Sequence, residues 1–182
     1  DRDDCGPLAF RSSRLHSPTL TVATAGVVTL TFSHRYSFEA DTTRWDGGQL
    51  RISVNQGPYV TVPLAGFTAN GYNDTVGGAA VPNCELAGQQ AFTATSVGHD
   101  TGTYLTSIAT LGTFNQNDTI SIQFLGAWDD CSQGVAPNWE IDSVQFNPPL
   151  EDRRPAPSFT NPLLPADAAV VPMVDPEPRQ AL

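Results

Sequence analysis

Apolar and polar side chains alternate along most of the first 147 residues. The longest such run covers residues 28–39, where every second side chain is apolar or aromatic and the others are hydroxyl-bearing or charged. Successive side chains of a β-strand point to opposite faces, so this spacing predicts a strand with one buried face. That face carries Val28, Leu30, Phe32, His34, Tyr36 and Phe38. Shorter runs predict further strands in residues 17–23, 50–54, 60–62, 92–94 and 105–111.

Residues 119–146 contain two more predicted strands, joined by an acidic loop. The first keeps a single phase from Ile120 to Trp128. In the second, the apolar phase changes between Ile141 and Val144. A slip of one residue inside a strand is typical of a β-bulge, which we predict at that point. We expect this pair of strands to close a β-sandwich.

The composition favours an all-β chain of 182 residues with one sandwich and a tail. Residues 1–14 form a polar leader that contains Cys5, residues 15–147 form the sandwich, and residues 148–182 form an extended tail. Nine of the 35 tail residues are proline, and their apolar neighbours come in short pieces. Such a segment does not build a core of its own. It can instead add to an exposed sheet edge, on its own sandwich or on a neighbouring chain.

The charge of the chain narrows the range of partners. Lysine is absent, and the formal net charge is −10. Nucleic acids and anionic membranes are therefore not expected partners, because both attract basic surfaces. No apolar run approaches the ~20 residues that span a bilayer. Three cysteines and a first residue other than methionine lead us to expect a processed, secreted protein in an extracellular or periplasmic compartment.

Seven short motifs follow one another between residues 14 and 147. They are RLHSPTL, LTFSHRYSFE, WDGGQLRIS, GYNDT, LAGQQAFTATSVG, NDTISIQFLGAWDD and NWEIDSVQF. In this order they resemble the MAM-like jelly-roll module of secreted bacterial proteins, as found C-terminally in immune-inhibitor-A-type metallopeptidases. The resemblance implies a non-catalytic, extracellular, antiparallel two-sheet jelly roll. Such modules usually have another strand before the SPTL segment, where this chain has only the leader.

Acidic residues are the best candidates for chemistry. If consecutive strands run antiparallel, one end of the sandwich gathers Glu39, Asp41, Asp46, Asp100, Asp129 and Asp130. Calcium takes six to eight oxygen ligands, and loop carboxylates with backbone carbonyls supply them. The resemblance points to a metal set of Glu39, Asp46, Asp129 and Asp142, because related modules can bind structural calcium. The alternative interpretation is an acidic rim that stays in water.

No catalytic constellation stands out in the sequence, and we predict that the protein is not an enzyme. The three histidines have no metal-binding spacing, and alternation places His34 in the core as a hydrogen-bonded side chain. No serine lies in a nucleophile elbow. Nothing marks two carboxylates as a glycosidase pair.

Aromatic residues suggest a site for glycans. Trp45 and Tyr72 flank turns, so we expect them to be exposed and able to bind a ligand. Trp128 and Trp139 continue apolar faces and are expected in the core.

The three cysteines allow one disulfide with one cysteine left over. The antiparallel arrangement places Cys5 and Cys131 at the same end of the sandwich, which favours a Cys5–Cys131 bond. A Cys84–Cys131 bond is the alternative if the long loop that carries Cys84 folds back.

Two functions agree with these observations. The first is a structural or assembly subunit whose proline-rich tail packs on a neighbouring chain. The second is a calcium-stabilised accessory module that binds carbohydrate or protein for a larger secreted protein.

Overall fold

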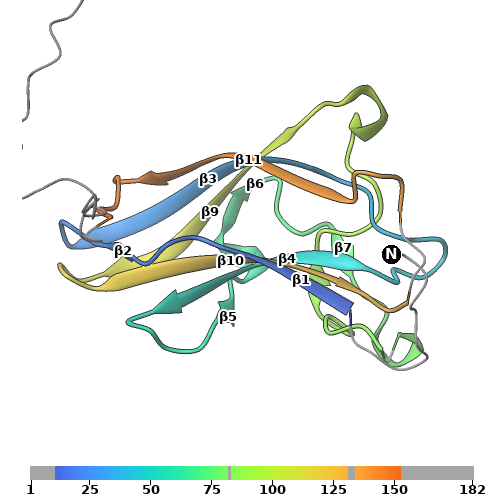
Figure 1. The fold of residues 1–182 in the computed structure, drawn as a ribbon, viewed down its shortest axis with the longest axis horizontal. Helices are drawn as coiled ribbons and strands as arrows, with labels where there is room; N and C mark the ends of the chain where they lie inside the picture. Colours follow the sequence, from blue (N-terminus) through green and yellow to red (C-terminus); the bar gives the residue numbers. More distant parts are fainter. Residues whose placement is uncertain (1–10, 82, 131–133, 153–182) are drawn as a thin grey trace, which may run out of the picture.

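The computed structural model describes residues 11–81, 83–130 and 134–152, which form two antiparallel sheets packed face to face (Figure 1). The first sheet has the order β1–β10–β4–β5, and β2 also pairs with β10. The second sheet has the order β11–β3–β9–β6. The chain passes repeatedly from one layer to the other, as in a jelly roll. The strands are β1 (Arg11–His16), β2 (Leu20–Thr21), β3 (Gly26–Tyr36), β4 (Gly47–Val54), β5 (Val60–Thr61), β6 (Phe67–Ala69), β9 (Leu105–Phe114), β10 (Thr119–Trp128) and β11 (Trp139–Asn147).

Two short strands outside the sandwich, β7 (Asp74–Thr75) and β8 (Gln90–Ala91), pair with each other. Helices in the described residues are limited to the 3-10 turns η1 (Leu64–Gly66), η2 (Gly78–Ala80) and η3 (His99–Thr101). None of these turns is long or apolar enough to cross a membrane.

β3 has the alternation that the sequence predicts. Val28, Leu30, Phe32 and His34 are fully buried between the sheets, while the residues between them are only half-buried. β3 pairs with β11 on one side and with β9 on the other. The strand predicted in residues 105–111 is part of β9, so this region is confirmed as β-structure.

The predicted bulge in β11 is confirmed. Asp142 pairs with Ser33, but Gln145 pairs with Thr31, so β11 advances three residues where β3 advances two. Ser143 takes up the extra residue with a φ of 51°. Beyond the bulge, Phe146 returns to the inner face and packs against the core.

Two details differ from the expected arrangement. β10 and β11 are consecutive in the chain, yet β10 belongs to the first sheet and β11 to the second. They therefore face each other across the sandwich instead of pairing. In addition, β1 begins at Arg11 and pairs with β10 over its whole length, so part of the predicted leader belongs to the first sheet.

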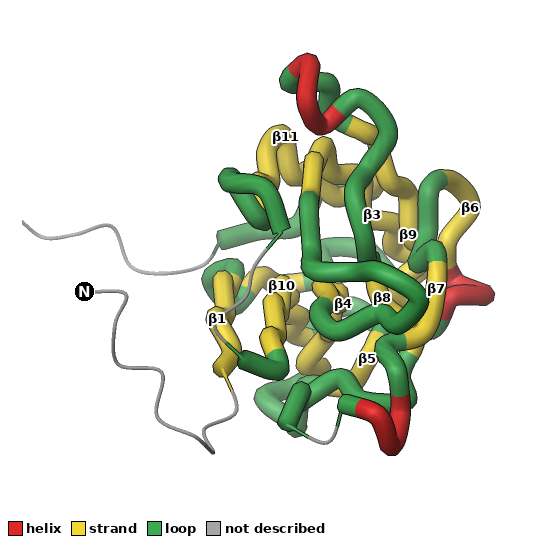
Figure 2. The backbone as a smooth tube through the Cα atoms, turned by 90° about the vertical axis from the view of Figure 1, so that its right-hand side faces the viewer, coloured by secondary structure: helices red, strands yellow, loops and turns green. Residues whose placement is uncertain are grey.

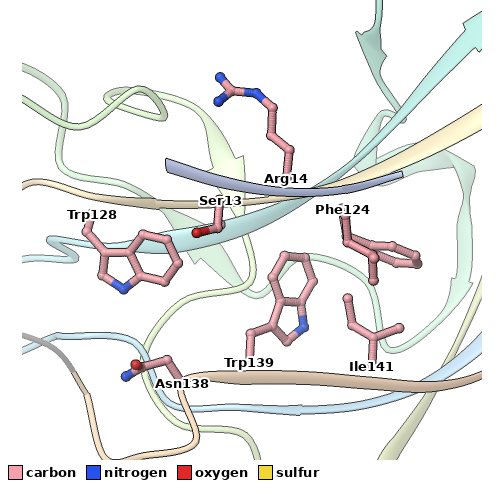
Figure 3. A pocket seen from close by; sticks show the side chains of 9 residues that line it. Ser13, Arg14, Phe124, Trp128, Asn138, Trp139 and Ile141 are labelled. Carbon is pink, nitrogen blue, oxygen red and sulfur yellow. The ribbon is translucent and has the colours of Figure 1, made fainter. Parts of the chain in front are cut away.

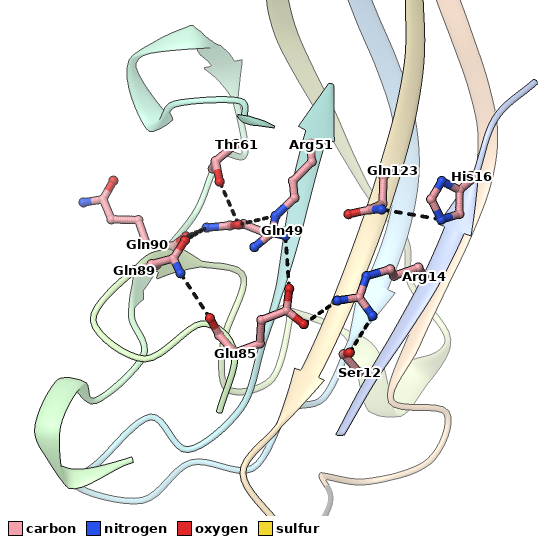
Figure 4. A network of polar contacts seen from close by, with 10 residues as sticks. All are labelled: Ser12, Arg14, His16, Gln49, Arg51, Thr61, Glu85, Gln89, Gln90 and Gln123. Carbon is pink, nitrogen blue, oxygen red and sulfur yellow. Dashed lines mark hydrogen bonds and ion pairs between the residues drawn. The ribbon is translucent and has the colours of Figure 1, made fainter. Parts of the chain in front are cut away.

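Part of the predicted loop of residues 65–90 is β6 of the second sheet, and the part from Val76 onwards covers the outer face of the first sheet (Figure 2). A small second core lies there, made of Val76, Val81, Cys84, Leu86 and Ala91 with Leu125 and Ala127 of β10. Glu85 in this loop forms ion pairs with Arg14 of β1 (2.5 Å) and Arg51 of β4 (3.1 Å) (Figure 4). The loop is thus attached to the sheet by apolar packing and by one carboxylate between two guanidinium groups.

Candidate metal centre

Two loops meet at one end of the sandwich, on the right of Figure 1, and between them they carry three acidic residues. Glu39 follows β3, Asp46 precedes β4, and Asp129 follows β10 directly. Their carboxylate oxygens lie within 4.8 Å of one another. The structure therefore brings together three of the four residues in the predicted metal set. We call Glu39, Asp46 and Asp129 the acidic triad.

Asp46 is the most buried member of the triad, with no exposed surface at all. Its Oδ1 accepts a hydrogen bond from the backbone N–H of Asp129, at 3.1 Å. Its Oδ2 is buried and has no hydrogen-bond partner in the described part of the chain. Glu39 Oε2 and Asp129 Oδ1 are likewise buried without a partner. Each triad member thus presents one buried oxygen that no described residue satisfies.

Burial raises the pKa of Asp46 to about 7, and the charges of Asp129 and Glu39 add to this effect. Burial also raises the pKa of Glu39, with smaller contributions from the nearby negative charges of Asp130, Asp129 and Asp41. The pKa of Asp129 is raised by burial and by the charge of Asp130. Loss of water and mutual repulsion both disfavour the charged carboxylates, as expected for acids crowded into a partly dry site.

No basic side chain relieves this crowding among the described residues. The ion pairs there join Arg14 and Arg51 to Glu85, Arg35 to Glu140 and Arg44 to Asp74. A cation bound between the triad oxygens would supply the missing positive charge. Three carboxylates form an all-oxygen set, which suits a hard cation such as calcium better than a metal that prefers nitrogen or sulfur.

The fourth predicted ligand, Asp142, is not brought into the triad. It lies on β11 opposite Ser33, six residues before Glu39 on the neighbouring strand. At about 3.3 Å per residue this register separates it from Glu39 by about 20 Å along the strands. Asp142 is exposed, and its Oδ1 accepts a hydrogen bond from the backbone N–H of Ser143 in the bulge.

The two predicted glycan-binding aromatics have different surroundings. The expectation that Tyr72 is exposed is wrong, because its side chain is buried in the core. Its hydroxyl bonds to both the backbone N–H and the C=O of Leu50, each at 3.0 Å. Trp45 is half-buried against the small second core, and its Nε1 donates to Asp41 Oδ1 at 3.1 Å. Tyr72 therefore offers no surface to a glycan, whereas Trp45 is partly exposed.

Cys84 is a buried free thiol among the described residues. Burial raises its pKa to about 11, and the charges of Asp46 and Asp129 contribute in the same direction. Cys5 and Cys131 lie outside the described residues. The predicted Cys5–Cys131 bond therefore stays a prediction, whereas the alternative Cys84–Cys131 bond does not agree with the free thiol of Cys84.

His34 is a neutral core histidine, as alternation predicts. It has no exposed surface, and burial lowers its pKa to about 4. Its Nδ1 accepts a hydrogen bond from Trp139 Nε1 at 3.2 Å, so Nδ1 carries no proton. Its Nε2 lies 2.8 Å from Ser107 Oγ, and the hydroxyl in turn donates to the C=O of Asn70. The His34 ring on β3 thus contacts both neighbouring strands, β9 through Ser107 and β11 through Trp139.

Comparisons with protein-family models, with curated proteins and with solved structures found no match. The resemblance to the MAM-like module therefore stays an expectation from the order of the sequence motifs. The geometry of the acidic triad is the strongest available guide to function.

Proposed function

We propose that this chain is a non-catalytic structural module of a secreted protein, a β-sandwich whose end loops are held together by calcium. The observation that carries the proposal is the set of three buried, unpartnered carboxylate oxygens in the acidic triad. An acidic rim in water would leave such oxygens hydrated. Burial without a partner is costly, and a bound cation removes that cost.

The nature of the site also favours an extracellular calcium ion. Three protein carboxylates make a site of moderate charge, and extracellular modules bind calcium with dissociation constants of about 10⁻⁴–10⁻³ M. Glu39 and Asp46 lie on the β3–β4 loop and Asp129 lies on the β10–β11 loop, and each of these two loops crosses from one sheet to the other. One ion between them would therefore tie the two layers together at this end.

Thermal unfolding of the full chain in calcium and in chelator tests this proposal. Ligand at 100 times its dissociation constant stabilises a protein by about 2.7 kcal/mol. For a domain of this size we expect the midpoint to rise by about 5–11 °C in calcium. Magnesium serves as the control ion, because its strict octahedral geometry suits three loop carboxylates poorly. Equal midpoints in calcium and chelator would contradict the proposal.

A second role, in assembly with other protein chains through the tail of residues 148–182, is favoured by a separate observation. β1 and β11 are the edge strands of the two sheets on the same side of the sandwich. Free edges of this kind accept extended segments. Light scattering on the full chain and on a chain that ends at Asn147 tests this role. Oligomers that vanish on truncation would support it, and two monomers would rule out self-assembly through the tail.

A further inference from the structure

A row of polar side chains crosses the outer face of the first sheet, beside the loop that covers part of this face (Figure 4). Gln123 on β10 pairs with His16 on β1 and with Arg51 on β4, and partners in an antiparallel pair share a face. Leu125 lies two residues along β10 on the same face and belongs to the small second core. The row therefore lies on the outer face, next to the covering loop, and His16 at its end is exposed.

Gln123 has an unmet hydrogen-bonding requirement. The residue is 3% exposed, and its Oε1 has no partner among the described residues. Its Nε2 has only a long contact, at 3.4 Å from His16 Nε2, and the amide oxygen lies on the side away from His16 (Figure 4). A buried acceptor without a donor lowers the stability of the fold. A hydroxyl group bound beside Gln123 would supply the missing donor.

Two arginines next to Gln123 share a single carboxylate. Glu85 pairs with Arg14 at 2.5 Å and with Arg51 at 3.1 Å, and the side chain of Arg14 is 40% exposed. The other ion pairs of the described residues join one arginine to one acid. Two guanidinium groups and one carboxylate leave one positive charge in this cluster, although the whole chain has a net charge of −10. Arginine binds carboxylates through charge-assisted hydrogen bonds, so the cluster suits a second carboxylate.

Aromatic rings flank the other side of Gln123. The Tyr59 and His16 rings meet edge to face, with centroids 5.2 Å apart and planes at 72°. The Tyr59 hydroxyl lies 3.0 Å from His16 Nδ1 and 2.8 Å from Ser121 Oγ, which fixes the position of both rings. Binding sites for small molecules combine aromatic surface with a few placed polar groups. The outer face has both within one row.

A groove of about 420 Å³ between β1 and β11 is less suited to a polar ligand (Figure 3). Trp128 and Trp139 face each other across it; both are half-buried and pack against the main core, as alternation predicts. Arg14 also lines the groove, but its guanidinium group points away and bonds to Glu85. The groove is therefore mainly apolar, and nothing among the described residues shows what covers it.

We propose that the outer face of the first sheet binds a hexuronate, the acidic sugar unit of a polysaccharide, at Gln123. Its carboxylate pairs with Arg14 and Arg51, and a ring hydroxyl donates a hydrogen bond to Gln123 Oε1. Arg14 and His16 are exposed side chains of an edge strand, so they can move aside and uncover Gln123 without a change of the backbone. This binding site goes beyond the structural role proposed above and does not depend on calcium.

Nuclear magnetic resonance titration of the full chain in calcium-free buffer tests the proposal. The probes are D-glucuronate, D-glucose, which differs from it only at C6, and acetate, which has a carboxylate and no sugar ring. We expect glucuronate to shift the side-chain amide signals of Gln123 and the Nε signal of Arg51 in a saturable manner. Its affinity should exceed that of glucose and of acetate by about tenfold or more, because each of these lacks one set of hydrogen bonds.

Arg14→Met and Arg44→Met form a matched pair of variants. Each removes one ion-paired arginine and changes the net charge equally, but Arg44 pairs with Asp74 outside this row. We expect Arg14→Met to lower the affinity for glucuronate by about tenfold or more and Arg44→Met to leave it unchanged. Gln123→Met removes the acceptor and keeps the length of the side chain. It should weaken glucuronate binding by a similar factor without lowering the thermal midpoint, because the buried oxygen without a donor is removed.

Four results would overturn the proposal. They are equal affinities for glucuronate and glucose, an acetate affinity equal to that of glucuronate, equal losses in Arg14→Met and Arg44→Met, and unchanged binding in Gln123→Met. An acetate affinity equal to that of glucuronate would identify a site for simple anions only. If Gln123→Met does not fold, the comparison of the two arginine variants still decides the outcome. A missing calcium shift in thermal unfolding leaves all of these comparisons intact.

Discussion

Asp46→Asn replaces a carboxylate by a neutral carboxamide. It removes the negative charge that the acidic triad accommodates least well. Asp46 has a pKa of about 7 in the folded protein against an ordinary value of 3.8. An acid whose pKa is raised by folding contributes stability at low pH, and this contribution is lost as the pH rises through the folded pKa. At pH 7.5 the shift corresponds to about 4 kcal/mol of lost stability at most. The side chain has no exposed surface, so solvent does little to reduce this cost.

In chelator at pH 7.5 we therefore expect Asp46→Asn to be more stable than the unsubstituted protein, by about 2–4 kcal/mol in urea unfolding and by roughly 5–15 °C in thermal midpoint. The amide oxygen still accepts the hydrogen bond from the Asp129 N–H. In calcium we expect the unsubstituted protein to be as stable as the variant or more stable. The variant lacks the charge of one ligand, so calcium does not raise its thermal midpoint. The advantage of the variant in chelator shrinks towards pH 4, where the native Asp46 is protonated.

Asp100→Asn is the matched control for this experiment. Asp100 is exposed on η3 and is not a member of the acidic triad, although the sequence places it at the same end. We expect its substitution to leave both the chelator midpoint and the calcium shift unchanged. If Asp46→Asn is no more stable than the unsubstituted protein in chelator, Asp46 carries no uncompensated charge and the triad is ordinary acidic surface. A calcium shift that survives in Asp46→Asn would also refute the assignment of Asp46 as a ligand.

Three further predictions concern the core. His34 has a pKa of about 4 in the folded protein against an ordinary value of 6.5, so its contribution to the free energy of unfolding is full above pH 6.5 and is lost as the pH falls to 4. In an Asp46→Asn background, urea unfolding should show the free energy of unfolding fall by about 3 kcal/mol over this range. The further substitution His34→Gln should remove this fall. Gly48→Ala places a methyl group against the Trp139 ring and should cost about 1–3 kcal/mol in urea unfolding, whereas Gly78→Ala, which meets nothing within 4 Å, should cost little. Tyr72→Phe removes the hydroxyl that bridges Leu50 and should cost about 1–3 kcal/mol without altering any glycan binding, so a glycan affinity that depends on this hydroxyl would contradict its core role.

The strands could be predicted from the sequence because one face of each is buried. The alternation in β3 and the phase change in β11 show which side chains face the core, and the structure confirms both. Periodicity does not record which strand lies alongside. The sequence therefore predicts β10 and β11 as consecutive strands that close the sandwich, but it does not show that they occupy opposite sheets.

The same distinction applies to the candidate sites. Asp46 and Asp129 directly adjoin the ends of long strands and Glu39 lies three residues beyond β3, so antiparallel geometry brings them to one end. Asp142 lies within a strand, where its position depends on register, and it is placed apart from the triad. Tyr72 follows a turn but points inward, because its hydroxyl satisfies the backbone of a neighbouring strand. A turn signal locates the backbone and does not locate the side chain.

The acidic triad departs from the rule that a folded domain satisfies its buried polar atoms, and places that depart from this rule are often functional. The unmet requirement there is positive charge, since three buried oxygens have no donor among the described residues. This deficit specifies the chemistry of what would remove it, which is a hard cation held by oxygen ligands. Chelation removes such a cation without changing the chain, so the difference between the midpoints in calcium and in chelator measures the deficit directly.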